Sequence, residues 1–288
     1  MGVALEGRPS QTALAAAAAR AAHLVVDQES LIFRDTAAMA LLGEPGEEMV
    51  GYHRSSGDHI VLAGTRAQVT VRSRHTEQRL GELAGRGLDQ YVVLGAGLDT
   101  FAYRSPLVGR LRVFEVDHPA TQRWKRELLA AAGIAPPEAL VFAGVDLEAE
   151  PLVERLADVG FDPTRPALVS WLGVSMYLTA EAVAATLAAV GGLAAGTELV
   201  VEYALPPALR DEGGQAYAGF ALSVAEQRGE PWLSFFTPEQ LSTLLEAHGL
   251  TVTGHARQRD AVPAALWHRT DALRPLDLCR LAQAVVSP

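Results

Sequence analysis

The chain has 288 residues, of which 49% are hydrophobic, enough to bury a large core as one domain or as a domain with a cap. Its 24 basic and 34 acidic side chains give a net charge of -10, which argues against nucleic acids and anionic membrane surfaces as partners. The single cysteine, Cys279, can build neither a disulfide framework nor a cysteine-based zinc site, which fits a reducing cytoplasm. We therefore expect a cytoplasmic protein that acts on a small molecule, as a monomer or a homodimer.

The first 85 residues are predicted to be helical. The alanine-rich run after Ser10, a plausible N-cap, is typical of a helix and not of a signal peptide, because Glu6 comes early and no basic region precedes it. Helices are predicted over 10–26, 31–42 and 65–84, with loops at "GEPGEE" (43–48) and "HRSSGDH" (53–59). We expect residues 1–85 to form an N-terminal helical cap.

From residue 90 onwards, short apolar runs alternate with amphipathic segments. Strands are predicted at 91–95, 111–117, 139–146, 166–173, 197–205, 250–256 and 279–286. Helices are predicted at 119–132, 151–159, 180–194 and 237–248, the last with the capping-box pattern "TPEQ". This alternation predicts an α/β fold over residues 86–288: a doubly wound, mostly parallel seven-stranded sheet with helices on both faces.

A glycine turn follows the first strand in "VVLGAGLDT". Ligands of doubly wound sheets bind beyond the carboxyl ends of the strands, so Gly95, Ala96 and Gly97 are candidate cofactor contacts. A dinucleotide loop would have a third glycine at the position of Thr100, and a P-loop would need Gly-Lys-Ser/Thr after the glycines. Asp99 is either part of the site or only a cap of the next helix. The turn alone does not select a cofactor.

Acidic residues close the next two predicted strands. Asp117 ends "LRVFEVD" and can accept hydrogen bonds from ribose hydroxyls, as an acid at this place does for NAD as well. Asp146 and Leu147 follow the third strand, where a carboxylate can accept the adenine amino group and a leucine can pack on the ring. Both acids could instead only cap the turns that follow. Together with Thr100, these strand ends favour S-adenosylmethionine over NAD.

The sequence resembles class I methyltransferases of the leucine carboxyl methyltransferase type, in their bacterial branch of O-methyltransferases. The resemblance covers most of the chain and is specific for the family, but not for the substrate. It is carried by "PSQTALAAAAARAAH" (9–23), "VRSR" (71–74), "VVLGAGLDTFAYR" (92–104), "VFEVDHP" (113–119), "VDL" (145–147), "WLGVSMYLT" (171–179) and "FFTPEQL" (235–241). It implies a Rossmann-like fold and S-adenosyl-L-methionine as the cofactor, with S-adenosyl-L-homocysteine as the product.

The resemblance also implies roles for the strand-end residues. The turn at Gly95 to Gly97 would hold the methionine part of the cofactor, and Asp117 the ribose. Further predicted cofactor contacts are His118, Asp146, Leu147 and Trp171.

An arginine ahead of the first strand would bind the cofactor carboxylate. Arg72 and Arg74 are the candidates, and two residues apart on a helix they cannot share a face. Arg72 shares its face with Val69, Leu80 and Leu83, so it should point inward, and we predict that it is the clamp. The alternative is a structural ion pair.

One position departs from the family pattern. Many members have a glutamate before the glycine that follows the fourth strand, near the cofactor's amino group, and this chain has Leu172 there. The amino group must then be held by backbone carbonyls or by another acid.

The remaining predicted residues concern the methyl acceptor. Leu172, Tyr177 and Tyr203 are expected around the substrate pocket, with aromatic core packing as the alternative. A phenol or alcohol acceptor needs a base whereas a carboxylate does not, and Tyr177, His23 and His53 are the candidate catalytic residues. No metal-binding motif is found, so a metal-assisted reaction is disfavoured.

The combined prediction is an S-adenosylmethionine-dependent O-methyltransferase of the kind met in secondary metabolism. Its acceptor would be a small-molecule carboxylate or a phenol or other hydroxyl compound. The alternatives are a carboxyl methyltransferase of a peptide or protein, a non-catalytic partner protein that binds the cofactor, and an NAD-dependent oxidoreductase, which Thr100 disfavours.

Overall fold

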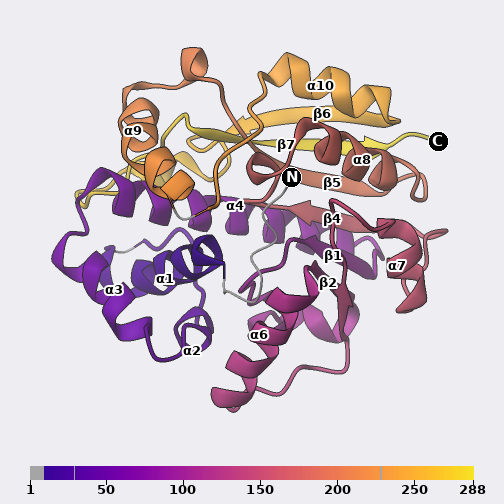
Figure 1. The fold of residues 1–288 in the computed structure, drawn as a ribbon, viewed down its shortest axis with the longest axis horizontal. Helices are drawn as coiled ribbons and strands as arrows, with labels where there is room; N and C mark the ends of the chain where they lie inside the picture. The colour runs from indigo at the N-terminus through magenta and orange to yellow at the C-terminus, as the bar shows by residue number, and fades with distance from the viewer. Residues whose placement is uncertain (1–9, 29, 228) are drawn as a thin grey trace.

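The computed structural model describes residues 10–28, 30–227 and 229–288, built around a sheet of seven strands (Figure 1). The strands are β1 (Gln90–Leu94), β2 (Arg112–Asp117), β3 (Leu140–Gly144), β4 (Leu168–Trp171), β5 (Glu198–Ala204), β6 (Leu250–Arg257) and β7 (Cys279–Val286). Their order is β3-β2-β1-β4-β5-β7-β6, and β7 runs antiparallel to both of its neighbours. All seven predicted strands are confirmed, as is the mostly parallel sheet.

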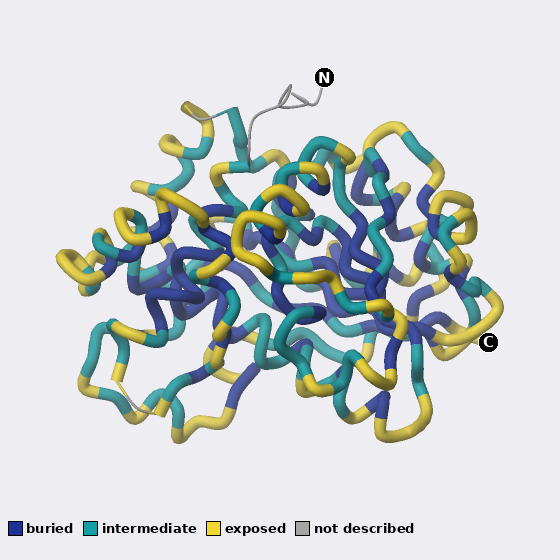
Figure 2. Tube along the Cα trace, turned by 90° about the horizontal axis from the view of Figure 1, so that it is seen from below, coloured by how far each residue is buried: buried dark blue, intermediate teal, exposed yellow. Residues whose placement is uncertain are grey.

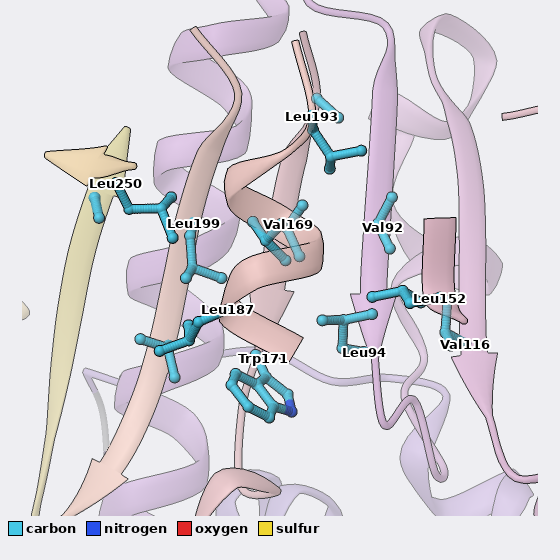
Figure 3. Packing of buried hydrophobic residues seen from close by; sticks show 14 of the residues in the cluster. Val92, Leu94, Val116, Leu152, Val169, Trp171, Leu187, Leu193, Leu199 and Leu250 are labelled. Atoms are coloured by element: carbon cyan, nitrogen blue, oxygen red, sulfur yellow. The ribbon is translucent and has the colours of Figure 1, made fainter. Parts of the chain in front are cut away.

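Both faces of the sheet are buried, which explains the unbroken apolar runs of its central strands. In β1, Val92 and Leu94 point to one face, while Tyr91 and Val93 point to the other. The first face packs against α7 (Leu152–Asp158), α8 (Ala180–Gly191) and α10 (Pro238–Ala247), and Figure 3 shows this core around Val92, Leu94 and Trp171. The second packs against α4 (Ile60–Ala84). In Figure 2 the buried segments accordingly run through the middle of the molecule.

The remaining helices are α1 (Gln11–Val26), α2 (Ala38–Leu41), α3 (Gly46–Ser55), α5 (Phe101–Arg104), α6 (Pro119–Ala131) and α9 (Glu212–Gln227). Short 3-10 turns are η1 (Pro106–Arg110), η2 (Ser175–Tyr177), η3 (Pro207–Leu209) and η4 (Ala264–Trp267). In Figure 1, α1, α2 and α3 gather at one end of the molecule, and α4 extends from them along the sheet. None of the helices in the described ranges is both long and apolar enough to cross a bilayer.

The N-terminal region has two parts with different surroundings. Helices α1, α2 and α3 pack on one another, and α1 also packs on α4. Helix α4 itself lies on the sheet, with Val71 and Leu80 in the same core cluster as Tyr91. The boundary at residue 85 stays a prediction, and residues 1–9 of the predicted cap lie outside the described residues.

Two local predictions were wrong, and one helix was not predicted. The helix expected over 31–42 shrinks to α2, because the Asp35 carboxylate accepts hydrogen bonds from the backbone N–H groups of Ala37 and Ala38 and starts the helix only there. Helix α3 forms where loops were expected. Helix α9 was missed because its start contains Gly213 and Gly214, where an added Cβ would lie 2.6 Å from Leu276 and 2.5 Å from a backbone oxygen. These glycines serve close packing and do not mark a loop.

Candidate functional site

A cavity of about 460 Å³ lies at the carboxyl ends of the strands, below the first turns of α1. Its lining comes from the ends of β1 and β2, from the segments that follow β3 and β4, from α4 and from residues 229–233. The volume is in the range of small-molecule and cofactor sites. The cavity therefore lies where doubly wound sheets bind their ligands.

The glycine turn forms one wall of this cavity. Gly95 and Gly97 have φ angles of 66° and 47°, in the left-handed region that favours glycine. A Cβ on Gly95 would lie 2.3 Å from Cγ2 of Val174, and one on Gly97 would lie 3.2 Å from Cβ of Ala13. The turn thus packs between the segment after β4 and helix α1, which leave little room for side chains at Gly95 and Gly97. Ala96 also lines the cavity.

Asp117 lies beside the turn, at the end of β2. Its Oδ2 accepts a hydrogen bond from the backbone N–H of Gly97 at 2.6 Å, and its Oδ1 accepts one from the N–H of His118 at 2.7 Å. Burial raises the pKa of Asp117, and these two backbone donors oppose the rise. His118 also lines the cavity, and its Nδ1 caps α6 by accepting from the N–H of Ala120.

The acids after β1 and β3 both line the cavity and cap local turns. Asp99 accepts a hydrogen bond from the N–H of Phe101 at 2.8 Å, and Asp146 accepts one from Glu148 at 3.0 Å. Leu147 lies next to Asp146 on the cavity wall. The predicted cofactor role and the alternative capping role are therefore compatible at both positions.

Of the two candidate arginines, Arg72 reaches the cavity. A Cβ on Gly173 would lie 2.4 Å from one of its guanidinium nitrogens, so the guanidinium occupies the space next to that glycine. Arg72 also forms an ion pair of 2.5 Å with Glu202 of β5, so the structural alternative holds at the same time. Arg74 donates instead to the carbonyl of Ile32, outside the cavity lining.

Trp171 and Tyr203 require a correction, because neither lines the cavity. Both are fully buried on the sheet face that α8 and α10 cover, and Figure 3 shows the indole of Trp171 beside Leu94 and Leu187. The Tyr203 hydroxyl contacts Nδ1 of His255 at 2.8 Å. The alternation of side chains along β4 and β5 places both residues in the core. Both therefore pack as core aromatics, which was the alternative to a place in the pocket. Leu172, by contrast, lines the cavity.

His23 and His53 also require a correction, because both are buried away from the cavity lining. His23 contacts Asp27 through Nδ1 at 2.8 Å, and its Nε2 accepts from the N–H of Ile32, so neither nitrogen is available to a substrate. Nδ1 of His53 lies 3.1 Å from Arg66, which itself pairs with Asp27. Burial, with the Arg66 charge, lowers the pKa of His53 to about 4. The two histidines join α1, α3 and α4 and are structural.

A second buried network ties the cap to the glycine turn. The Asp35 carboxylate pairs with Arg20 at 2.7 Å and accepts from the Thr100 hydroxyl at 2.7 Å, while Arg20 also donates to the carbonyl of Leu98. Burial alone would raise the pKa of Asp35, but Arg20, Arg104 and the Thr100 hydrogen bond outweigh burial and lower it. Thr100, where a dinucleotide loop has glycine, is thus an anchor for the cap.

Tyr177 lines the cavity together with residues that sequence reasoning missed. The backbone N–H of Thr12 donates to Oε2 of Glu230 at 3.0 Å, and the Thr12 hydroxyl contacts the same oxygen. Leu233 completes this part of the lining, which we call the acceptor lobe: Thr12, Tyr177, Glu230 and Leu233. Burial raises the pKa of Tyr177, so its phenol stays protonated. No sequence signal pairs residues 12 and 230, which are 218 positions apart.

The strand order, with β7 antiparallel beside β5, and the strand-end cavity define the class I methyltransferase fold. Solved structures agree: a candidate methyltransferase from Thermobifida fusca superposes with a TM-score of 0.60 at 18% identity, over 98% of this chain and 96% of that one. A DUF574 family protein from Streptomyces avermitilis gives a TM-score of 0.59 at 18% identity, over 94% and 97%. At this identity the likeness concerns the fold.

The chain belongs to the leucine carboxyl methyltransferase family, whose profile matches residues 13–191. YktD of Bacillus subtilis, a candidate S-adenosyl-L-methionine-dependent methyltransferase, is 34% identical over 75% of this chain and 71% of its own. A Mycobacteroides abscessus protein of the same description is 34% identical over 59% of this chain and 56% of its own. The protein is thus an S-adenosylmethionine-dependent methyltransferase, and the NAD-dependent alternative is wrong.

The cavity residues fit this cofactor. The turn at Gly95 to Gly97 lines the cavity, with Val174 and Ala13 packed against its two glycines, and Asp117 presents a carboxylate beside it. Arg72 and Asp146, the residues that the family resemblance assigns to the cofactor carboxylate and to adenine, line the same cavity. The individual roles of these residues stay predictions.

Proposed function

We propose that the protein transfers the methyl group to an oxygen atom of a small organic acceptor bound in the acceptor lobe. The cofactor supplies an electrophilic methyl group, so the protein has to align the acceptor oxygen and exclude water. The observation that carries this proposal is the extension of the cavity beyond the strand ends to Thr12, Tyr177 and Glu230. Such a partly apolar lobe suits a carboxylate, phenol or other hydroxyl compound of secondary metabolism in a reducing cytoplasm.

Two acceptor chemistries make different demands on the lobe. A carboxylate is ionised at neutral pH and attacks without a base, whereas a phenol or alcohol must lose a proton during transfer. His23 and His53 are committed to the cap, so the ionisable side chains of the lobe are Tyr177 and Glu230. A hydroxyl acceptor would therefore rely on Glu230 or on solvent to take the proton.

The contact between Thr12 and Glu230 favours a small acceptor over a peptide. It joins the start of α1 to the segment that contains residues 229–233, across the lobe. A peptide chain that entered there would have to break this contact, whereas a metabolite-sized molecule fits beneath it. The carboxyl methyltransferase reaction on a peptide or protein is therefore the second candidate.

Methyl transfer from labelled S-adenosylmethionine to a panel of aromatic acids, phenols and C-terminal peptides would test the proposal. Mild base distinguishes the products, because it releases methanol from a methyl ester and leaves an aryl methyl ether intact. Labelled small-molecule esters or ethers would support the proposal, and labelled peptides alone would overturn it. A chain that binds the cofactor but labels no member of a broad panel, a metabolite extract included, would favour the non-catalytic alternative.

A further inference from the structure

Two arginine–glutamate pairs join helix α4 to strand β5. Arg72 contacts Glu202 at 2.5 Å, and Arg79, two helical turns further on, contacts Glu198 at 2.6 Å. Glu198 and Glu202 are four residues apart on the strand, so alternation sends both side chains to the α4 face of the sheet. The pairs connect the same two elements, but only Arg72 reaches the cavity lining.

The Arg72 pair is the more deeply buried of the two. The Glu202 side chain is 3% exposed, whereas that of Glu198 is 18% exposed. Each Glu202 oxygen has a donor, because Oε2 accepts from Arg72 and Oε1 accepts from Nε2 of Gln68 at 3.0 Å. Two donors from successive turns of α4 therefore fix the orientation of this carboxylate, which is not part of the cavity lining.

Arg72 has donors to spare for a ligand. A guanidinium has five N–H groups in a rigid plane, and the contact with Glu202 is made through one of its terminal nitrogens. Its side chain is 14% exposed and lines the cavity next to Gly173, so a ligand in the cavity can reach the guanidinium. Since the guanidinium is planar, fixing one nitrogen restricts the direction of the others.

We propose that Glu202 is a positioning residue for cofactor binding: it holds the Arg72 guanidinium so that the free part of the fork meets the carboxylate of the methionine tail. Position 172, next to Gly173 in the cavity wall, is a leucine and carries no charge. Glu202, behind the arginine, is the carboxylate that orients Arg72 and balances its charge. The proposal concerns cofactor binding and is independent of which atom accepts the methyl group.

The test uses two ligands that share the adenosine part and differ in the tail. S-adenosylhomocysteine has the amino-acid carboxylate, and 5′-methylthioadenosine lacks it. Their dissociation constants would be measured by calorimetry for the wild-type protein, for Glu202→Gln and for Glu198→Gln. The second variant is a matched control, because it removes the charge of the other pair between the same two elements.

We expect Glu202→Gln to weaken S-adenosylhomocysteine binding about tenfold, the size of one charge-assisted contact, and to change 5′-methylthioadenosine binding less than about twofold. Glu198→Gln should leave both ligands within about twofold of the wild type. In an Arg72→Lys background, where the fork is already lost, Glu202→Gln should have little further effect. A merely structural role would weaken both ligands alike.

Unchanged or tighter S-adenosylhomocysteine binding by a folded Glu202→Gln variant would overturn the proposal, as would equal weakening of the two ligands. If that variant does not fold, Glu202→Asp keeps the charge but withdraws the carboxylate by one methylene, and the same selective loss is expected. Failure to find a methylated acceptor would count against the proposed O-methyl transfer and leave these binding results intact.

Discussion

The two sides of the cavity are built in different ways. The cofactor side consists of a glycine turn and acids at the ends of neighbouring strands, such as Gly95 and Asp117, each held by backbone hydrogen bonds or close packing. The acceptor side joins segments that are far apart in the chain, and one contact, between Thr12 and Glu230, spans it. The sheet fixes only the first side, so the shape of the second side depends on a contact between distant segments of the chain.

The largest effect is expected at the cofactor side, from Gly95→Ala. The new Cβ would lie 2.3 Å from Val174 on a backbone with φ of 66°, so we expect about 3 kcal/mol of destabilisation and loss of measurable cofactor binding. Gly133→Ala is the control, because Gly133 has a φ of 67° with nothing within 4 Å of the added Cβ. Denaturant unfolding should show about 1 kcal/mol for the control. Equal losses would mean that the turn is strained but not tightly packed.

Asp117→Asn tests whether the adenosine end depends on one carboxylate. The change removes the charge beside Gly97, and we expect about a 100-fold loss of affinity, equal for S-adenosylhomocysteine and 5′-methylthioadenosine because both contain the ribose. Calorimetry would measure it. Glu148→Gln is the control, because it removes a different acid from the cavity lining. Its dissociation constants for both ligands should stay within about threefold of the wild type. A loss confined to the ligand with the tail would contradict the ribose role.

The pH dependence of stability tests whether His53 is buried and neutral in the contacts that join α3 to α4. Its pKa is about 4 in the folded protein and near 6.5 when unfolded, so unfolding takes up a proton between these values. The stability from neutral His53 is therefore complete above pH 6.5 and is lost as the pH falls towards 4, by up to about 3 kcal/mol. The difference between the wild-type and His53→Gln unfolding free energies should shrink over this range. A constant difference would show that His53 is not buried neutral beside Arg66.

The smallest effect is expected from Thr12→Val, which removes the hydroxyl contact with Glu230 but keeps the backbone N–H. We expect stability to fall by less than about 1 kcal/mol and S-adenosylhomocysteine to dissociate about two- to fivefold faster, measured by stopped-flow fluorescence. Ser10→Ala removes the N-cap of the same helix without touching Glu230 and serves as the control. If both variants release the ligand equally fast, helix fraying explains the effect and the contact across the lobe does not.

The features that could be predicted from the sequence are those set by residues close together in the chain. Apolar runs located the seven strands, and the glycine or aspartate that ends each of the first three located the turn at Gly95 and the acids Asp117 and Asp146, because a parallel sheet brings strand ends to one edge. Helical spacing likewise distinguished Arg72 from Arg74. The roles of these residues towards the cofactor come from the family and still need the measurements above.

The failures came where tertiary contacts override local pattern. Trp171 and Tyr203 stand near strand ends, but the face on which each side chain lies depends on strand phase, and the core takes both. His53 became a candidate because its partner Arg66 lies 13 positions away, whereas the contact of His23 with Asp27, four residues further on, is local and helical spacing could have indicated it. No pattern in the sequence around Glu230 indicates its contact with Thr12, because the two residues are 218 positions apart and meet only in the folded chain.

The position of β7 dictates an order of assembly. Strand β6 precedes β7 in the chain but joins the sheet only through it, because β7 pairs with β5 on one side and β6 on the other. Until β7 arrives, β5 is an unpaired edge strand, and unpaired edges invite pairing with another chain. We expect intermediates that lack β7 to be the aggregation-prone species of this protein. Residues added after Val286 that slow the docking of β7 should therefore lower the yield of folded enzyme.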